Sequence, residues 1–84
     1  MKNKILVELI VPEVETSYNV FLPINRKIGN VIVLLSRAVS ELTGGVYAVS
    51  NKANLYDAIT GNVYNMDATV LDTDIRNGSK IVLF

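Results

Sequence analysis

The sequence predicts an α+β domain in which one main helix packs on one face of a mixed β-sheet. Two strand-like segments, residues 4–11 and 17–22, lie near the start of the chain, and residues 80–84 form a third near its end. Between them, apolar residues recur at the three- and four-residue spacing of an amphipathic helix. One long helix flanked by strands is the order expected of a single-sheet α+β fold.

The first two segments are expected to form an antiparallel hairpin. Residues 4–11 are rich in β-branched side chains and end at Pro12, which lacks the N–H that a central sheet ladder needs. A polar connection follows, and residues 17–22 then alternate between the two faces. This alternation, extended to the closing strand, assigns one set of side chains to the core: Ile5, Val7, Leu9, Tyr18, Val20, Leu22, Ile81 and Leu83.

The central helix is predicted to run from Asn25 to Thr43. Pro23 breaks the preceding strand, and Asn25 offers a side-chain cap for the first turn. Gly44 and Gly45 are expected to end the helix, because glycine readily adopts the left-handed conformation found at helix C-termini. The apolar positions of the helix follow the i, i+3, i+4, i+7 rule: Ile28, Val31, Ile32, Leu35, Ala38, Val39 and Leu42.

The second half of the chain has a less regular pattern. Residues 46–49 and 55–56 are predicted to be short strands joined by a turn-rich stretch at 50–54. A further short strand is expected at 63–64, and a helical turn at 66–71. Asn77 and Gly78 tolerate positive φ, so they are expected to turn the chain into the closing strand.

Composition limits the chain to one small core and excludes several functions. The 84 residues are half apolar, which suits a stable globule that needs neither metals nor crosslinks. Eight basic and eight acidic residues are interspersed along the chain, so no basic face for nucleic acid is expected. The longest apolar run is too short to span a membrane, and no signal peptide precedes it, so we expect a cytoplasmic protein without direct membrane insertion.

The residues of the closing segment resemble the last loop and strand of ubiquitin-like domains. They read Val70-x-Asp72-x-x-Ile75-x-x-Gly78-x-x-Ile81-x-Leu83. The order of hairpin, long helix, short strands and closing strand is also that of the ubiquitin-like β-grasp. The resemblance implies that residues 1–84 form a single ubiquitin-like domain whose first and last strands run parallel at the centre of the sheet.

Within that superfamily, the chain is most similar to the bacterial YukD and EsaB proteins, ubiquitin-like accessories of type VII (WXG100) secretion systems. Two stretches carry this resemblance: Leu22-Pro23 followed by Ile28-x-x-Val31-Ile32-x-Leu34, and Asp72-x-x-Ile75-x-Asn77-Gly78-Ser79-Lys80-Ile81. The resemblance implies a non-conjugated protein–protein interaction module, accessory or regulatory to such a system. Its expected partner is another protein, such as a component of the secretion machine.

An alternative is a ubiquitin-like modifier or sulfur carrier that is made as part of a longer precursor ending in diglycine. Gly44-Gly45 is internal and is better explained as a helix terminator. With no His or Cys, and no spacing that indicates an activated nucleophile, paired acids or a calcium loop, we expect no catalytic, metal-binding or cofactor-binding residues. The sequence therefore predicts a protein that is not an enzyme.

The candidate site is the sheet face opposite the helix. Strand alternation directs a second set of apolar side chains to that face: Leu6, Ile10, Phe21, Val82 and Phe84. Because the first and last strands are neighbours in a β-grasp, these side chains are expected to form one apolar patch. A contiguous exposed patch of this kind is a candidate protein-binding surface, and a second copy of the chain is one possible partner.

Overall fold

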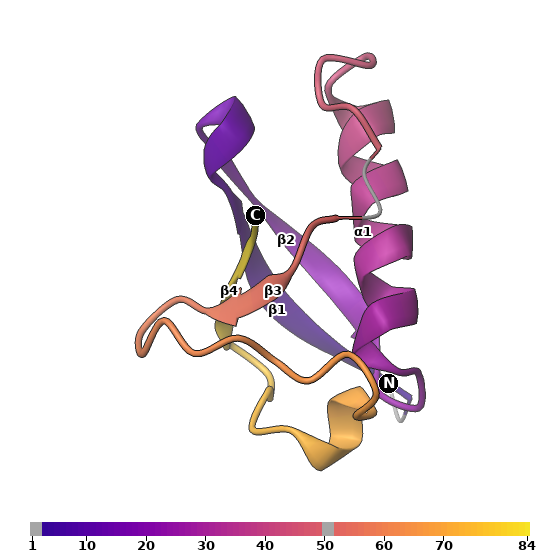
Figure 1. Ribbon diagram of the computed structural model, residues 1–84, viewed down its shortest axis with the longest axis vertical. Helices are drawn as coiled ribbons and strands as arrows, with labels where there is room; N and C mark the ends of the chain where they lie inside the picture. The colour runs from indigo at the N-terminus through magenta and orange to yellow at the C-terminus, as the bar shows by residue number, and fades with distance from the viewer. Residues whose placement is uncertain (1–2, 50–51) are drawn as a thin grey trace.

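The computed structural model describes residues 3–49 and 52–84 (Figure 1). It has four strands and one long helix, joined by turns that include two short 3₁₀ segments, η1 and η2. In chain order, these elements are β1 (Lys4–Val11), η1 (Pro12–Val14), β2 (Thr16–Pro23), α1 (Ile28–Leu42), β3 (Leu55–Asp57), η2 (Val70–Asp72) and β4 (Lys80–Leu83).

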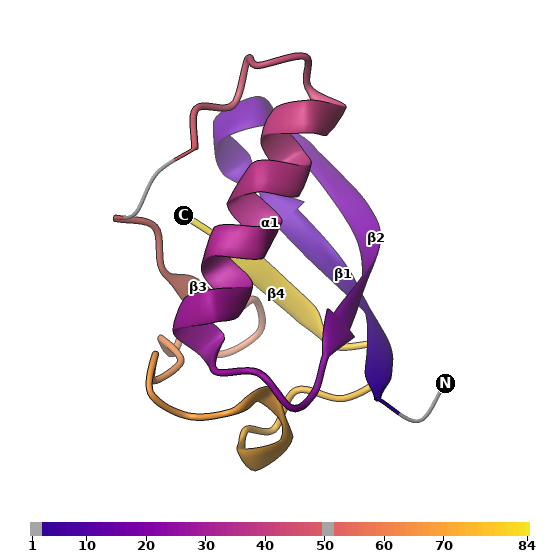
Figure 2. The same ribbon diagram turned by 90° about the vertical axis from the view of Figure 1, so that its right-hand side faces the viewer.

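The strands form one mixed sheet in the order β2-β1-β4-β3. The β1–β2 and β3–β4 pairs are antiparallel, whereas β1 and β4 run parallel at the centre. The helix lies across one face of this sheet (Figure 2). This arrangement is the β-grasp, and both the helix-on-sheet architecture and the central parallel pair predicted from the sequence are confirmed.

The helix begins at Ile28, three residues later than predicted, and Asn25 does not cap it. Backbone carbonyls of the 65–69 segment cap the helix instead. The amide of Ile28 donates to the oxygen of Ala68 (2.8 Å), and the amide of Gly29 donates to the oxygen of Met66 (3.0 Å). The otherwise unpaired N–H groups of the first turn therefore have partners without a capping side chain. The helix end agrees with prediction, since Gly44 and Gly45 have φ of 63° and 88°.

The core lies between α1 and the inner face of the sheet. Of the strand residues assigned to it from the sequence, Ile5, Tyr18 and Val20 are only partly buried, because they lie toward the strand end or the β2 edge, where the helix covers less. The remainder are buried, and Leu35 of the helix is 5% exposed. The buried apolar residues are Val7, Leu9, Val11, Leu22, Ile28, Val31, Ile32, Leu35, Val39, Tyr47, Ala53, Leu55, Val70, Ile75, Ile81 and Leu83.

The strand predicted at 46–49 is not formed. Val46 is 78% exposed, whereas Tyr47 is buried and anchors the loop that follows the helix. A strand here could not pair with β3, because the outer edge of β3 is already occupied by residues 62–64. The amide of Asp57 donates to the oxygen of Asn62, and that of Tyr64 to the oxygen of Leu55, both at 2.9 Å.

The other short elements are confirmed in part. The strand predicted at 55–56 is present as β3. The one predicted at 63–64 is reduced to a single bridge between Val63 and Tyr56. The helical turn lies at Val70–Asp72, toward the end of the predicted 66–71 range. Residues 50–51 of the predicted turn-rich stretch lie outside the described residues.

Candidate protein-binding face

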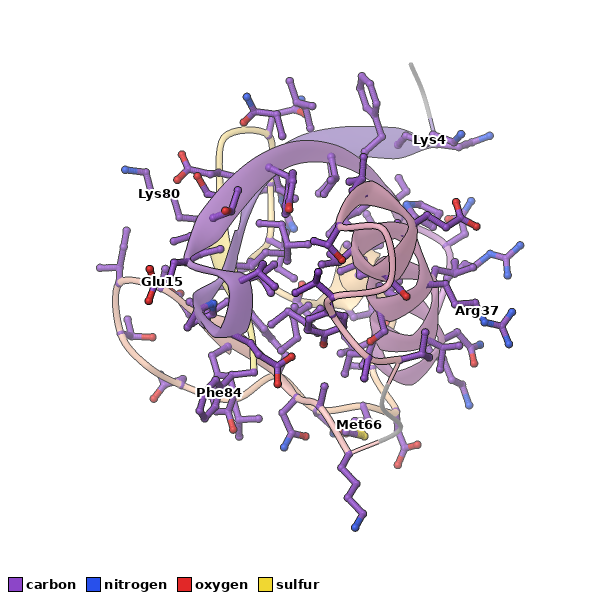
Figure 3. All side chains as sticks on the ribbon, turned by 90° about the horizontal axis from the view of Figure 1, so that it is seen from above. Lys4, Glu15, Arg37, Met66, Lys80 and Phe84 are labelled. Carbon is purple, nitrogen blue, oxygen red and sulfur yellow. The ribbon has the colours of Figure 1, made fainter. Side chains whose placement is uncertain are left out.

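The candidate site is the outer face of the sheet, on the side that the helix leaves uncovered. Along β1, the inward-pointing Val7, Leu9 and Val11 are buried, so Leu6, Glu8 and Ile10 point outward. Figure 3 shows Lys80 and Phe84 on this side of the molecule, and Arg37 on the solvent side of α1. The structure thus places all five residues predicted for the site on one face.

The first apolar cluster on this face is a directly opposed pair. Leu6 of β1 lies opposite Phe21 of β2 in the antiparallel register. Both side chains are exposed, Phe21 at 53%. We call these two residues the Phe21 group. An exposed aromatic–aliphatic pair of this kind presents apolar surface that a partner would bury.

The second apolar cluster spans three neighbouring strands. Ile10 of β1 is opposite Val82 of β4, which in turn is opposite Tyr56 of β3. Phe84 follows on the same face and is 71% exposed. Its backbone continues the ladder, because Phe84 and Asn54 exchange two hydrogen bonds of 3.0 and 2.9 Å. We call Ile10, Tyr56, Val82 and Phe84 the Phe84 group.

A polar row divides the two groups, so the single continuous patch expected from the sequence is not found. Glu8 lies between them, with Asn19 opposite it on one side and Lys80 on the other. Ile10 is four positions after Leu6 in β1, which at about 3.3 Å per residue puts the groups roughly 13 Å apart. The face therefore has two apolar anchor points with charged side chains between them.

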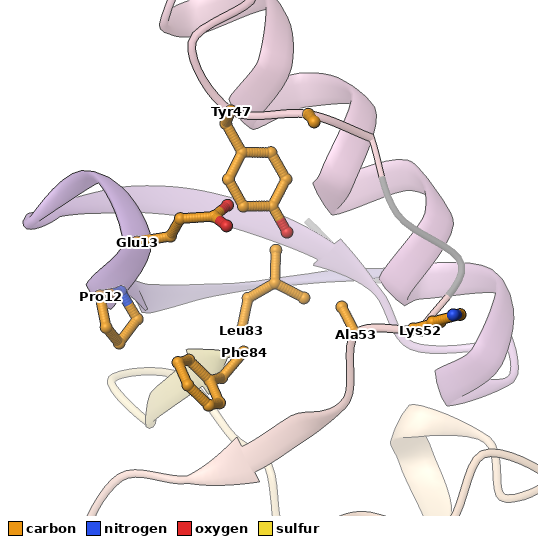
Figure 4. A pocket seen from close by; sticks show the side chains of 8 residues that line it. Pro12, Glu13, Tyr47, Lys52, Ala53, Leu83 and Phe84 are labelled. Carbon is orange, nitrogen blue, oxygen red and sulfur yellow. The ribbon is translucent and has the colours of Figure 1, made fainter.

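A hollow adjoins the Phe84 group. It has a volume of about 460 Å³ and lies where η1, the loop after α1 and the end of β4 meet (Figure 4). Its walls are mostly apolar, and Glu13 and Lys52 add opposite charges. The lining residues are Pro12, Glu13, Tyr47, Ala48, Lys52, Ala53, Leu83 and Phe84. This hollow gives one end of the outer face a concave border.

A smaller hollow of about 210 Å³ lies at the other end of β4, where that strand begins. Asp57, Tyr64, Asp74 and Lys80 are among its lining residues. Burial, followed by hydrogen bonding to Asp74 and its negative charge, raises the pKa of the Tyr64 phenol well above its usual value of 10; Asp57 acts in the same direction. Tyr64 is therefore neutral at physiological pH.

The placement of the acidic side chains bears on metal binding. Within residues 3–49 and 52–84, no three acidic side chains are placed to hold a metal ion together. The helix that the structure describes is also too short to cross a membrane. The outer face instead carries two apolar groups beside a hollow, an arrangement that suits contact with the surface of another protein.

Sequence reasoning missed part of this site. The sequence predicts both Tyr56 and Tyr47 in short strands but assigns neither side chain to a face of the sheet. Only the register opposite Val82 places Tyr56 on the outer face. Tyr47 reaches the hollow from a loop, and so do Pro12 and Glu13 from η1. No pattern along the chain could bring these distant segments together.

Comparison with known proteins supports the fold. No protein-family model matches the sequence, and no curated protein matches it. Among solved structures, the chain is similar to the ubiquitin-like domain of the Mycobacterium tuberculosis type VII secretion system protein ECCD1. The TM-score is 0.72 at 13% identity, covering 95% of this chain and 96% of that one. It is also similar to the EccD5 ubiquitin-like domain from Mycobacterium xenopi, with TM-score 0.77, 15% identity, and 96% and 92% coverage.

A third similar structure belongs to a larger assembly, the MycP5-free ESX-5 inner membrane complex. The TM-score is 0.79 at 16% identity, and the match covers 98% of this chain. This chain spans only 21% of the length of the chain that it matches there. At these identities the likeness establishes the fold alone, which is the ubiquitin-like β-grasp.

Proposed function

We propose that this chain is a non-conjugated interaction module that binds a protein through the outer face of its sheet. The observation that carries the proposal is the pair of apolar groups on a face that no other part of the described chain covers. Aromatic side chains dominate binding energy at interfaces, and Phe21 and Phe84 supply one to each group. The module performs no reaction of its own in this proposal.

We further propose that the partner belongs to a bacterial type VII secretion system, to which the chain is a cytoplasmic accessory of the YukD and EsaB type. The sequence resemblance supports this assignment. So does the fold shared with the ECCD1 and EccD5 domains. The charged row between the two apolar groups favours a partner surface that is itself mixed, apolar at two points and polar between them.

Complementation of secretion tests the proposal. The gene is deleted in its native bacterium, and export of the small helical WXG-type proteins is measured by quantitative immunoblotting. The wild-type chain should restore export, whereas the double variant Phe21→Ala/Phe84→Ser should not. Val33→Ala, an exposed apolar residue of α1, is the matched control and should restore export fully.

Export that is unaffected by the deletion would contradict the secretion assignment. Full restoration by Phe21→Ala/Phe84→Ser would contradict the assignment of the outer face. Circular dichroism of the purified variants should show folding close to wild type, because both phenylalanines are exposed.

A further inference from the structure

The sheet has one open edge in the part of the chain that the structure describes. At the β3 end, residues 62–64 cover the outer backbone through hydrogen bonds from Asp57 and Tyr64. At the opposite end, β2 pairs only with β1. An open edge presents unpaired N–H and C=O groups that can add another strand.

The outward-pointing backbone groups of β2 can be identified from the pairing of β1. The oxygen of Leu6 accepts a bond from the Gly78 amide (2.8 Å), and the amide of Glu8 donates to the Ser79 oxygen (2.9 Å). Even-numbered residues of β1 therefore direct their backbone toward β4, and odd-numbered ones toward β2. By the register, the residues of β2 whose N–H and C=O point to solvent are Ser17, Asn19 and Phe21.

Devices that usually protect an edge strand are missing from β2. Its eight residues, Thr16–Pro23, include no charged side chain. Its register with β1 runs residue for residue without a bulge. The one proline is the last residue of the strand, beyond the three outward N–H groups. Natural proteins commonly block such an edge with lysine, proline or a bulge, so a strand without them is suited to pairing.

We propose that a second copy of this chain occupies the edge, with the two β2 strands antiparallel about a two-fold axis at Asn19. Asn19 then lies opposite its counterpart, and Ser17 of each copy lies opposite Phe21 of the other. Each of these opposed pairs exchanges two backbone hydrogen bonds. The strand suits its own copy because it is uncharged, so no like charges meet across the axis.

Closure of the assembly also favours a second copy over an unrelated strand. Pairing joins the two sheets into one, whose outer edges are then the two β3 edges that residues 62–64 already cover. The interface is isologous, and so the assembly stops at two copies. Because the added strand lies beside β2, the outer faces of both copies stay accessible, and this inference does not depend on the proposed function.

Sedimentation equilibrium and amide hydrogen exchange test the proposal on the purified chain. With rising concentration, the mass should approach twice the 9.2 kDa of one chain. The amides of Ser17, Asn19 and Phe21 should gain protection in parallel. Tyr18 and Val20, which face β1, should be protected at every concentration, because their bonds lie within one copy.

Two variants probe the interface. Asn19→Lys puts two like charges opposite each other at the axis, and should raise the dissociation constant of the dimer about tenfold or more. Asn62→Lys makes the same change in the segment that covers the other edge, and should leave dimerisation unchanged. Ser17→Pro removes an outward N–H without touching the bonds to β1, and should also weaken the dimer.

A wild-type chain that stays monomeric at millimolar concentration would overturn the proposal, as would a dimer whose affinity Asn19→Lys and Ser17→Pro leave unchanged. Protection that rises at amides other than Ser17, Asn19 and Phe21 would place the interface on another surface, with the same consequence.

Discussion

Replacing Ser36 by alanine should stabilise the protein, although the residue is in the middle of the helix and buried. Ser36 is fully buried, and its hydroxyl oxygen has no hydrogen-bond partner in the structure. A hydroxyl that loses its water without gaining a partner costs about 1–3 kcal/mol. Alanine removes that cost and has the higher helix propensity, by about 0.5 kcal/mol. The void left by one oxygen atom offsets part of the gain.

The net expectation is a stabilisation of about 1–2 kcal/mol, which for a domain of this size raises the melting temperature by roughly 4–16 °C. Urea unfolding followed by circular dichroism measures the free energy, and Ser40→Ala is the matched control. Ser40 is in the same helix but only partly buried, so its replacement changes propensity without removing a fully buried hydroxyl. Subtracting its effect isolates the burial term.

A free energy of unfolding that is lower in Ser36→Ala than in the wild type by more than about 0.5 kcal/mol would refute this reasoning. It would mean that the hydroxyl has a partner after all, such as an ordered water or the carbonyl one turn earlier in the helix.

Three further predictions concern the core, a loop and pH. Leu35→Ala, one residue before Ser36, should lower the free energy of unfolding by about 2–5 kcal/mol by opening a cavity, and a loss under about 0.5 kcal/mol in the same urea assay would contradict the packing of α1. Asn77→Ala should speed hydrogen exchange at the Leu6 amide, which donates to the Asn77 side-chain oxygen at 2.9 Å; unchanged exchange would show that this bond is not formed in solution. Tyr64 has a pKa raised by burial and by Asp74, so the folded state holds its phenolic proton more tightly than the unfolded state. Its contribution to stability is complete below pH 10 and is lost as the pH rises above that value, and Tyr64→Phe should therefore lose less stability between about pH 9.5 and 11.5 than the wild type. Equal losses would contradict the raised pKa.

The fold could be predicted where local pattern and global packing agree. The β-branched residues 4–11 and the proline after them predicted β1 to the residue. The apolar spacing from Ile28 onward identified the buried stripe of α1, except that Ala38 and Leu42, which were included in it, are exposed toward the end of the helix. The start of α1 could not be predicted, because its cap comes from carbonyls of Met66 and Ala68, which are distant in sequence. Nor could the sequence predict that residues 46–49 form no strand, because this depends on the edge of β3 being occupied by residues 62–64.

The sequence predicted which face of the sheet carries the candidate site, but not how the apolar residues are grouped on that face. Period-two alternation correctly placed Leu6, Ile10, Phe21, Val82 and Phe84 on one side of the sheet. Alternation carries no information on which rows of neighbouring strands align. In the structure, Glu8 lies opposite Asn19 on one side and opposite Lys80 on the other. These registers put a polar row between the two groups, and they could not be predicted from the sequence.

The central claim, that the outer face binds a protein of the secretion machine, is tested most directly by site-specific photocrosslinking in the native bacterium. A photoreactive amino acid replaces Phe21, Phe84 or, as the control on α1, Val33, and crosslinked proteins are identified by mass spectrometry. The account predicts adducts with a type VII secretion component from positions 21 and 84 and none from position 33. Adducts with such a component from position 33 alone would contradict it and move the binding surface to the helix.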